Sequence, residues 1–258
     1  AQAVFPDVPH VACFDTAFHA KIPSYDSSYA LPAPWRAAGV RRYGFHGLSY
    51  AWLMQRFGHL SPQSNGRILL AHLGNGASVC AVHKGLSIST SMGFSALDGL
   101  VMGSRCGNLD PGVVLYLLAH GLDSAAIEDL LYKRSGLYGL SGISADMRTL
   151  RASSDTAAQQ AITVFTYRLQ RELGSLLAAL EGADALLFTG GIGEHDARLR
   201  QDIGERLAWY GVRIDPVRNF ANSTEERCIS TADSTVEVWV IPTDEGRMAA
   251  QETLQLLS

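Results

Sequence analysis

The sequence predicts a layered α/β domain, and three observations favour it. Strand-like apolar runs are grouped early, over residues 67–91. Apolar residues then recur every three or four positions over 155–180, which is the spacing of one helix face. A fully apolar run follows directly at 185–188. Strands that come first, followed by helix-strand units, are typical of a sheet covered by helices.

The first half of the chain is divided by turn signals. Prolines and serines over 21–43 interrupt every period and predict an irregular loop, and residues 48–57 are expected to form a short helix. The stretch 67–91 predicts three strands, with Lys84-Gly85 as a hairpin turn. Pro111 predicts a helix start, and that helix should run to about His120 and end at Gly121.

The second half alternates helices with strands. The long helix over 155–180 ends at Gly182, and a further helix is expected over 197–209, closed by Gly211. Residues 235–241 alternate as a strand does, and a last helix follows Pro242–Gly246.

Composition and charge exclude several function classes. The 258 residues are 47% hydrophobic and 18% charged, which is ordinary for a globular protein with room for one large domain or two small ones. A net charge of −4 gives no electrostatic case for nucleic-acid or anionic-membrane partners. Four scattered cysteines (Cys13, Cys80, Cys106, Cys228) form no CxxC pair, which disfavours structural zinc and fits a reduced, cytoplasmic protein.

Two glycine-bearing turns carry the strongest functional signal. One lies in residues 67–78 and the other in 185–194, and each follows an apolar strand. Glycines let main-chain N–H groups approach an anion, because no Cβ blocks the approach. Either turn alone is more often a simple tight turn. Two of them in one chain favour a nucleotide held between two halves of a domain.

Several charged residues stand near glycines. His46 lies between Phe45 and Gly47, although a lone histidine is usually an ordinary hydrogen-bonded residue. Arg105 lies between Gly103 and Gly107, where it can fork onto phosphate or carboxylate oxygens or simply be a solvated loop arginine.

The carboxylates leave alternatives open. Asp15, flanked by aromatic residues, can be an arginine partner, a metal ligand or a helix N-cap. Asp146 is interpreted first as a helix start. Asp244 and Glu245 follow a strand directly, where carboxylates enter metal–phosphate sites or merely end a strand in solvent.

Taken together, these segments resemble the acetate kinase family, which includes acetate and propionate kinases and belongs to the superfamily of sugar kinases and actin. The resemblance covers essentially the whole chain, and its motifs occur in the family's order. They are Phe14–His19, Arg42–Gly47, His72–Gly76, Thr90–Phe94, Thr189–Glu194 and Ile241–Glu245. The resemblance implies a ribonuclease H-like (actin-like ATPase) lobe, with a mixed sheet flanked by helices.

The resemblance also implies a reaction: reversible phosphoryl transfer from ATP to acetate, or propionate, giving ADP and an acyl phosphate, with Mg²⁺ as cofactor. Asp15 would be the active-site aspartate, and His46 and Arg105 would stabilise the phosphoryl group in transfer. Phe45 and Ala96 would line the acyl pocket, and Glu245 would bind Mg²⁺. The implied nucleotide-binding residues are His72, Leu73, Gly74, Asn75, Gly76, Asp146, Met147, Arg148, Gly191, Ile192, Gly193, Glu194 and His195.

A carboxylate substrate is already ionised near neutral pH, so the reaction needs alignment and positive charge more than a strong base. We therefore expect Asp15 to orient Arg105 or a metal-bound water rather than to remove a proton.

The sequence departs from the family pattern in three ways. The family's N-terminal region, with its Asn-x-Gly-Ser-Ser-Ser run, has no counterpart here. His195 and Asp244 stand where the family has Asn, and Ala96 stands where Pro is common.

We expect residues 1–20 to be a remnant of an N-terminal lobe, 21–246 the C-terminal nucleotide-binding lobe, and 247–258 a helix packing on the other lobe. The intact protein is expected to be a homodimer. The alternative is a catalytically incomplete nucleotide-binding lobe or a regulatory member of the superfamily.

Overall fold

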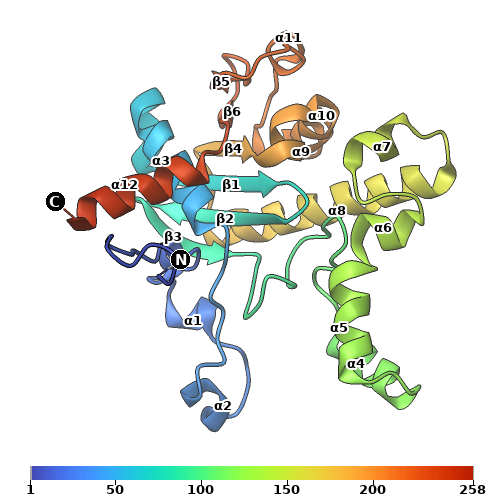
Figure 1. Cartoon of the computed structure of the whole chain (residues 1–258). Helices are drawn as coiled ribbons and strands as arrows, with labels where there is room; N and C mark the ends of the chain where they lie inside the picture. The colour runs from blue at the N-terminus through green and yellow to red at the C-terminus, as the bar shows by residue number, and fades with distance from the viewer. Residues whose placement is uncertain (1, 258) are drawn as a thin grey trace.

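The structure is a computed structural model that describes residues 2–257, and a six-stranded sheet lies at its centre (Figure 1). The strand order is β3-β2-β1-β4-β6-β5. The strands are β1 (Arg67–Leu73), β2 (Ala77–His83), β3 (Leu86–Thr90), β4 (Ala185–Thr189), β5 (Arg227–Cys228) and β6 (Glu237–Val240).

The first three strands form an antiparallel meander, as the sequence predicts. The turn between β2 and β3 consists of Lys84 and Gly85, both with positive φ (52° and 74°). This backbone matches the twist of the two strands that it joins.

The later strands pair in the parallel sense. β4 lies parallel to β1, and β6 lies parallel to β4, while β5 adds a short antiparallel edge. Because the carboxyl ends of parallel strands meet at one edge of a sheet, the chain segments that follow β1, β4 and β6 come together there.

Both faces of the sheet are buried. Leu69, Ala71 and Leu73 of β1 belong to the larger core cluster, which includes the apolar face of α8 (Thr156–Ala179). The intervening residues Ile68 and Leu70 belong to a second cluster with α3 (Gly47–Leu60). Strands covered on both faces are continuously apolar rather than alternating, which explains the uninterrupted runs in the sequence.

The helical part matches the predictions closely at α3, α8 and α4 (Pro111–Ala119) and differs elsewhere. The helix expected over 197–209 is α10 (Ala197–Arg206) followed by a 3₁₀ turn, and the last helix is α12 (Glu245–Leu257). The remaining helices are α5 (Ser124–Lys133), α6 (Gly136–Ser141), α7 (Met147–Ala152), α9 (Gly190–His195) and α11 (Pro216–Asn219).

The loop expected over 21–43 is wrong in part, because it contains α1 (Ser24–Ser27) and α2 (Ala33–Ala37). Pro32 is the N-cap residue of α2 and Pro34 lies in its first turn, where proline is compatible with a helix, so they mark its start rather than break it. Neither short helix contains enough residues to show a period.

The N-terminal segment contacts the last helix, α12 (Figure 1). The Cys13 thiol contacts the Ala249 carbonyl on α12 at 3.6 Å, and α12 packs along α3. The domain boundaries at residues 20 and 246 stay a prediction. None of the described helices is long and apolar enough to cross a membrane.

Candidate functional site

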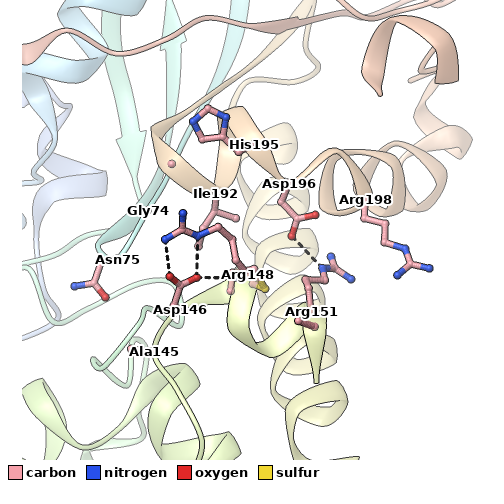
Figure 2. Close-up of a pocket in the computed structure, with 13 residues that line it drawn as sticks. Gly74, Asn75, Ala145, Asp146, Arg148, Arg151, Ile192, His195, Asp196 and Arg198 are labelled. Carbon is pink, nitrogen blue, oxygen red and sulfur yellow. Dashed lines mark hydrogen bonds and ion pairs between the residues drawn. The ribbon is translucent and has the colours of Figure 1, made fainter. Parts of the chain in front are cut away.

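A cavity of about 800 Å³ opens at the sheet edge where the segments after β1 and β4 meet (Figure 2). Eight of its lining residues are among the predicted nucleotide-binding residues: Gly74, Asn75, Asp146, Met147, Arg148, Gly191, Ile192 and His195. The other five are Ala145, Arg151, Ala152, Asp196 and Arg198.

The two glycine turns form one wall of the cavity. Gly74 begins the tight connection between β1 and β2, closed by a 2.9 Å bond from its N–H to the Gly76 carbonyl. β4 passes straight into α9 through Gly190, whose φ is 76°. A Cβ on Gly190 would lie 2.7 Å from the Leu73 carbonyl oxygen, so only glycine allows this approach of the two strand ends.

Gly191 differs from Gly190 because an added Cβ would meet nothing within 4 Å. Since Gly191 lines the cavity, that Cβ would occupy space that a ligand can use. The fold therefore does not require glycine at this position, but a larger side chain here would meet a ligand in the cavity.

The opposite wall is α7 and the segment before it. Asp146 caps α7 through the Arg148 N–H at 2.7 Å, which confirms the predicted helix start. The Arg148 guanidinium also binds this carboxylate and holds the pKa of Asp146 down at about 2. Deeper in the cavity, Arg151 donates to Asp196 at 3.0 Å and joins α7 to the start of α10 (Figure 2).

Other predicted nucleotide-binding residues lie behind the cavity wall. Leu73 and Gly193 are buried in the core. The Glu194 carboxylate accepts from the Gly190 N–H at 2.9 Å and from the Thr243 N–H at 3.2 Å. Glu194 therefore ties the β4–α9 junction to the segment after β6 and acts by holding the wall in place.

Beside the cavity, His46 and His72 stack with ring centroids 4.1 Å apart. A serine hydroxyl holds each ring: Ser78 is 2.8 Å from His46 Nδ1, and Ser49 is 2.8 Å from His72 Nδ1. Burial, with the Arg105 charge second, lowers the pKa of His46 to about 4. Burial likewise lowers the pKa of His72 to about 3. Both rings are therefore neutral at pH 7.

Gly76 marks the point where the predicted phosphoryl-binding residues meet. A Cβ on Gly76 would lie 3.2 Å from His46 Nε2 and 3.7 Å from Arg105 Nη1. The Arg105 guanidinium is fixed by a 3.1 Å bond from Nη1 to the Ala96 carbonyl. The structure thus brings His46, Arg105 and the first glycine turn together, next to the cavity.

Asp15 is a capping residue in this structure. Its carboxylate accepts from the main-chain N–H groups of His46 at 2.6 Å and Leu48 at 3.3 Å, at the start of α3. The structure gives Asp15 no hydrogen bond to Arg105 among the described residues, so the expected orientation of Arg105 falls instead to the Ala96 carbonyl.

Glu245 lies on the far side of the stacked rings. Its Oε1 is 4.0 Å from His72 Nδ1. Burial, and then the charge of Asp15, raises the pKa of Glu245. The Asp15 charge therefore acts on Glu245.

The predicted acyl-pocket residues are half-buried against the core. Phe45 and Ala96 both pack on the larger cluster. The buried His19 donates from Nε2 to the Phe45 carbonyl at 2.9 Å, and its Nδ1 pairs with Ser87 at 2.8 Å. His19 therefore holds Phe45 in place, a role that no sequence spacing indicates.

The pH dependence of stability tests the two neutral rings. An unfolded histidine titrates near 6.5, so between about pH 3 and 6.5 the unfolded chain binds more protons than the folded one, and stability falls as pH falls. From pH 7 to 5 each ring should contribute a loss of up to about 2 kcal/mol.

We expect a His46→Gln, His72→Gln double variant to lose clearly less stability over this pH range than the unaltered chain, measured by urea unfolding at both pH values. The exposed His120→Gln change is the control and should leave the pH dependence unchanged. Identical pH dependence in the double variant and the unaltered chain would contradict the neutral assignment.

The chain is similar to known proteins over nearly its whole length. Residues 1–251 match the acetokinase family. The chain is 55% identical over 254 residues to an acetate kinase of Rhodopseudomonas palustris, covering 97% of this chain and 64% of that protein. The solved acetate kinase of Porphyromonas gingivalis superposes with a TM-score of 0.94 at 37% identity, covering 100% of this chain and 66% of that one.

A propionate kinase structure from Francisella tularensis superposes with a TM-score of 0.91 at 41% identity, over 97% of this chain and 65% of that chain. The predicted fold is thereby confirmed. The chain spans about 64% of the length of the Rhodopseudomonas relative. By its sequence match, and with a structure that agrees over nearly its whole length, the chain belongs to the acetokinase family.

Proposed function

We propose that the protein containing this chain transfers the terminal phosphoryl group of ATP to a short carboxylate, acetate or propionate, and catalyses the reverse reaction. The observation that carries the proposal is the convergence of His46 Nε2 and Arg105 Nη1 on Gly76, between the cavity and the half-buried pair Phe45 and Ala96. A nucleotide in the cavity would direct its phosphates toward this point. A carboxylate between Phe45 and Ala96 would face it from the other side.

The chemistry follows from charge. A carboxylate oxygen forms the new bond to phosphorus while the bridging oxygen leaves with ADP, and no proton has to be removed from the attacking group. Catalysis then rests on alignment and on neutralising the phosphoryl oxygens. Arg105 supplies the positive charge, and the Ala96 carbonyl fixes its direction.

His46 would supply a neutral N–H donor. Tyr50 pairs with the Ser78 hydroxyl, which in turn pairs with His46 Nδ1. Burial raises the pKa of Tyr50 well above 10, so the phenol keeps its proton and can donate it in a hydrogen bond to the Ser78 hydroxyl. With Nδ1 accepting from Ser78, the ring proton is on Nε2, which faces Gly76.

Magnesium fits the residues present as part of a metal–nucleotide complex. Glu245 lies beside His72 and Asp15 beside the start of α3, and carboxylate oxygens are the ligands that Mg²⁺ prefers. Burial, and then the Asp15 charge, raises the pKa of Glu245. No cluster of three or more ligating side chains is found in residues 2–257, and Mg²⁺ commonly takes one or two carboxylates, with phosphates and waters as its other ligands. Bound there, it would neutralise phosphate charge.

The acyl pocket fits a short chain. Ala96 is smaller than proline, so we expect it to leave space for a methylene or so beside Phe45, and each buried methylene stabilises binding by roughly 0.8 kcal/mol. Discrimination between acetate and propionate is therefore expected to be slight. The solved relatives include proteins named for each of the two acids.

We also propose a homodimer in the cytoplasm. The four thiols are unpaired in the structure, which fits a reducing compartment.

The proposed dimer contact is α4. This helix buries none of its residues although its sequence is strongly apolar, and with α5 it projects away from the sheet (Figure 1). Val113, Leu115, Tyr116 and Leu118 are exposed on it. A second copy of this helix is the occupant that we propose for this surface.

Turnover tests the reaction. In the complete polypeptide that contains this chain, ATP-dependent phosphorylation of acetate and propionate is expected, and Arg105→Ala should lower kcat by on the order of 10²- to 10³-fold with little change in the KM for ATP. Arg105→Lys should rescue little, because an ammonium cannot fork onto two oxygens. The exposed Arg206→Ala is the matched control. Half of the original turnover in Arg105→Ala would remove Arg105 from the mechanism.

Nucleotide binding is tested separately at Gly191. Gly191→Val should fold normally, since its side chain enters open space, but should raise the Kd for ADP at least about tenfold, which is about 1.4 kcal/mol. Titration calorimetry measures this value. Gly58→Val on α3 also enters open space, away from the cavity, and should leave the Kd unchanged. Equal affinities in the two variants would place the nucleotide elsewhere.

The oligomeric state tests the α4 surface. Leu115→Glu buries a charge in the proposed interface and should shift the mass measured by light scattering from two copies to one. Val217→Glu, on the exposed face of α11, is the control and should leave the mass unchanged. A Leu115→Glu protein that stays dimeric at low micromolar concentration would exclude α4 as the contact.

A further inference from the structure

Arg42 lies outside the cavity and contacts neither His46 nor Arg105 by a hydrogen bond among the described residues, yet it makes one of the densest sets of polar contacts in the chain. Its Nη1 donates to three successive main-chain carbonyls, those of Thr90 at 2.9 Å, Ser91 at 3.2 Å and Met92 at 2.9 Å. One guanidinium thus fixes the path of the chain as it leaves β3.

Residues near Arg42 also hold Gly93 and Phe94, which follow Met92. The N–H groups of Tyr43 and Gly44, directly after Arg42, donate to the Gly93 carbonyl at 3.0 and 3.3 Å. The Tyr29 hydroxyl accepts from the Phe94 N–H at 2.8 Å. A Cβ on Gly93 would overlap both the Tyr29 hydroxyl and an Asp98 oxygen, so the packing there leaves no space.

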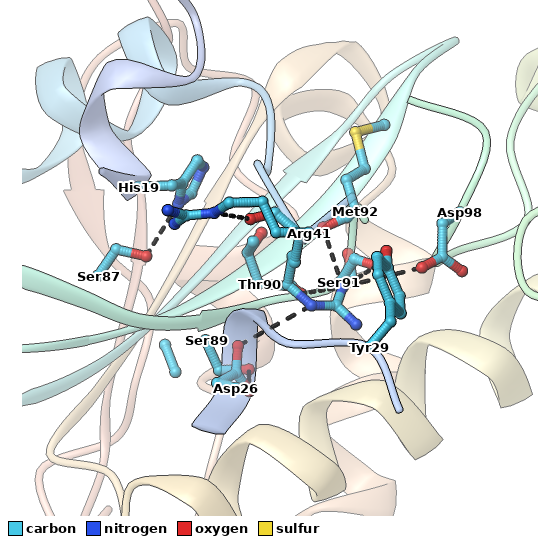
Figure 3. A network of polar contacts seen from close by, with 12 residues as sticks. His19, Asp26, Tyr29, Arg41, Ser87, Ser89, Thr90, Ser91, Met92 and Asp98 are labelled. Atoms are coloured by element: carbon cyan, nitrogen blue, oxygen red, sulfur yellow. Dashed lines mark hydrogen bonds and ion pairs between the residues drawn. The ribbon is translucent and has the colours of Figure 1, made fainter. Parts of the chain in front are cut away.

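Two carboxylates lie near the guanidinium. Asp26 is 3.9 Å from Arg42 Nε, and Asp98 is 3.8 Å from Nη1. Asp26 is itself fixed by a 2.8 Å bond from Ser89 on β3. Figure 3 shows Asp26, Tyr29 and Asp98 gathered around the backbone of Thr90–Met92. The contacts of Asp26 and Asp98 with Arg42 are ion pairs at 3.8 to 3.9 Å, longer than a hydrogen bond, so the two carboxylates balance the charge of the guanidinium while the three carbonyls fix its position.

The segment fixed in this way leads to the reacting groups. Two residues after Phe94 comes Ala96, whose carbonyl holds Arg105 Nη1 at 3.1 Å, and whose side chain lies in the proposed acyl pocket. Phe45, the other proposed acyl-pocket residue, lies three residues after Arg42. The two residues between them, Tyr43 and Gly44, donate to the Gly93 carbonyl. A shift of residues 90–98 would displace the acyl pocket and the Arg105 anchor together.

We propose that Arg42 is a positioning residue for carboxylate binding: it holds residues 90–98 so that Ala96 both closes the acyl pocket and anchors Arg105. This inference rests on the proposed carboxylate kinase function. It adds a residue that affects binding of the carboxylate and leaves binding of the nucleotide unchanged. The nucleotide cavity has different supports, Arg151–Asp196 and Glu194, and none of its lining residues belongs to this network.

The test compares two neighbouring arginines. Within residues 2–257 the Arg41 side chain donates only to the Arg42 carbonyl, at 3.3 Å, and its guanidinium lies over the Tyr43 ring, so Arg41→Met is the matched control. In the complete polypeptide, Arg42→Met should lower kcat/KM for the carboxylate by about 10²-fold, the scale expected when reacting groups are displaced by about 1 Å. The KM for ATP should stay within about twofold, because nucleotide binding is a separate interaction. Arg41→Met should change neither value.

Two further measurements separate positioning from simple loss of folding. Tyr29→Phe removes only the acceptor of the Phe94 N–H and should change the carboxylate KM in the same direction by a smaller factor. Hydrogen–deuterium exchange should quicken in residues 89–98 of Arg42→Met and stay unchanged in residues 185–195. Equal rises in both KM values, or faster exchange throughout the chain, would overturn the proposal and leave Arg42 a general stabilising residue.

The exchange experiment also distinguishes the two hypotheses. If the unaltered protein phosphorylates neither acid, the proposed function fails, whereas localised exchange in Arg42→Met would still show that Arg42 holds residues 89–98. If the unaltered protein is active and Arg42→Met retains its carboxylate kcat/KM, the positioning role fails while the function stands.

Discussion

The parallel pairing of β1 with β4 is the constraint on which the rest of the site depends. It matches Ile68 with Ala185 and continues to His72 with Thr189. Both strands are buried on both faces, so a slip of one residue would turn every apolar side chain into the wrong layer. The fixed register places the Leu73 carbonyl against Gly190 and so joins two turns that are far apart in the sequence. The cavity exists because these two strand ends cannot move independently.

A second constraint is electrostatic. His46 and His72 stack in a buried site near Arg105, where charging either ring would set like charges against each other. Serine hydroxyls hold both rings at Nδ1, and hydroxyls serve neutral rings as readily as charged ones. Beside Gly76 the site therefore presents the Arg105 cation together with a neutral histidine.

Much of the fold could be predicted because long elements carry a clear period. The apolar face of α8 and the runs of β1 and β4 are examples, and Asp146 and Pro111 marked helix starts correctly. The short helices α1, α2 and α6 could not be found, since four to six residues show no period.

Residues of the site that follow a strand could likewise be predicted, because glycine patterns mark them. The supporting residues could not. Ser78 and Tyr50 hold His46, and Arg151 pairs with Asp196, but the partners are separated by tens of residues and have ordinary local sequence. Asp15 shows the opposite case: the sequence left three roles open, and the structure supplies a cap at the start of α3.

The residues that support the cavity differ from those that support the proposed acyl pocket, and this division has a consequence for specificity. The nucleotide wall depends on buried Arg200, which donates to the Gly193 carbonyl at 2.7 Å and the Glu194 carbonyl at 2.9 Å from the far side of α9. The proposed acyl wall is held by hydrogen bonds from Arg42 to the Thr90 carbonyl and from His19 to the Phe45 carbonyl. The two proposed walls approach each other at Gly76 and Arg105. Because the two walls have different supporting residues, we expect a change in the proposed acyl wall to alter which carboxylate binds while the nucleotide wall keeps its geometry.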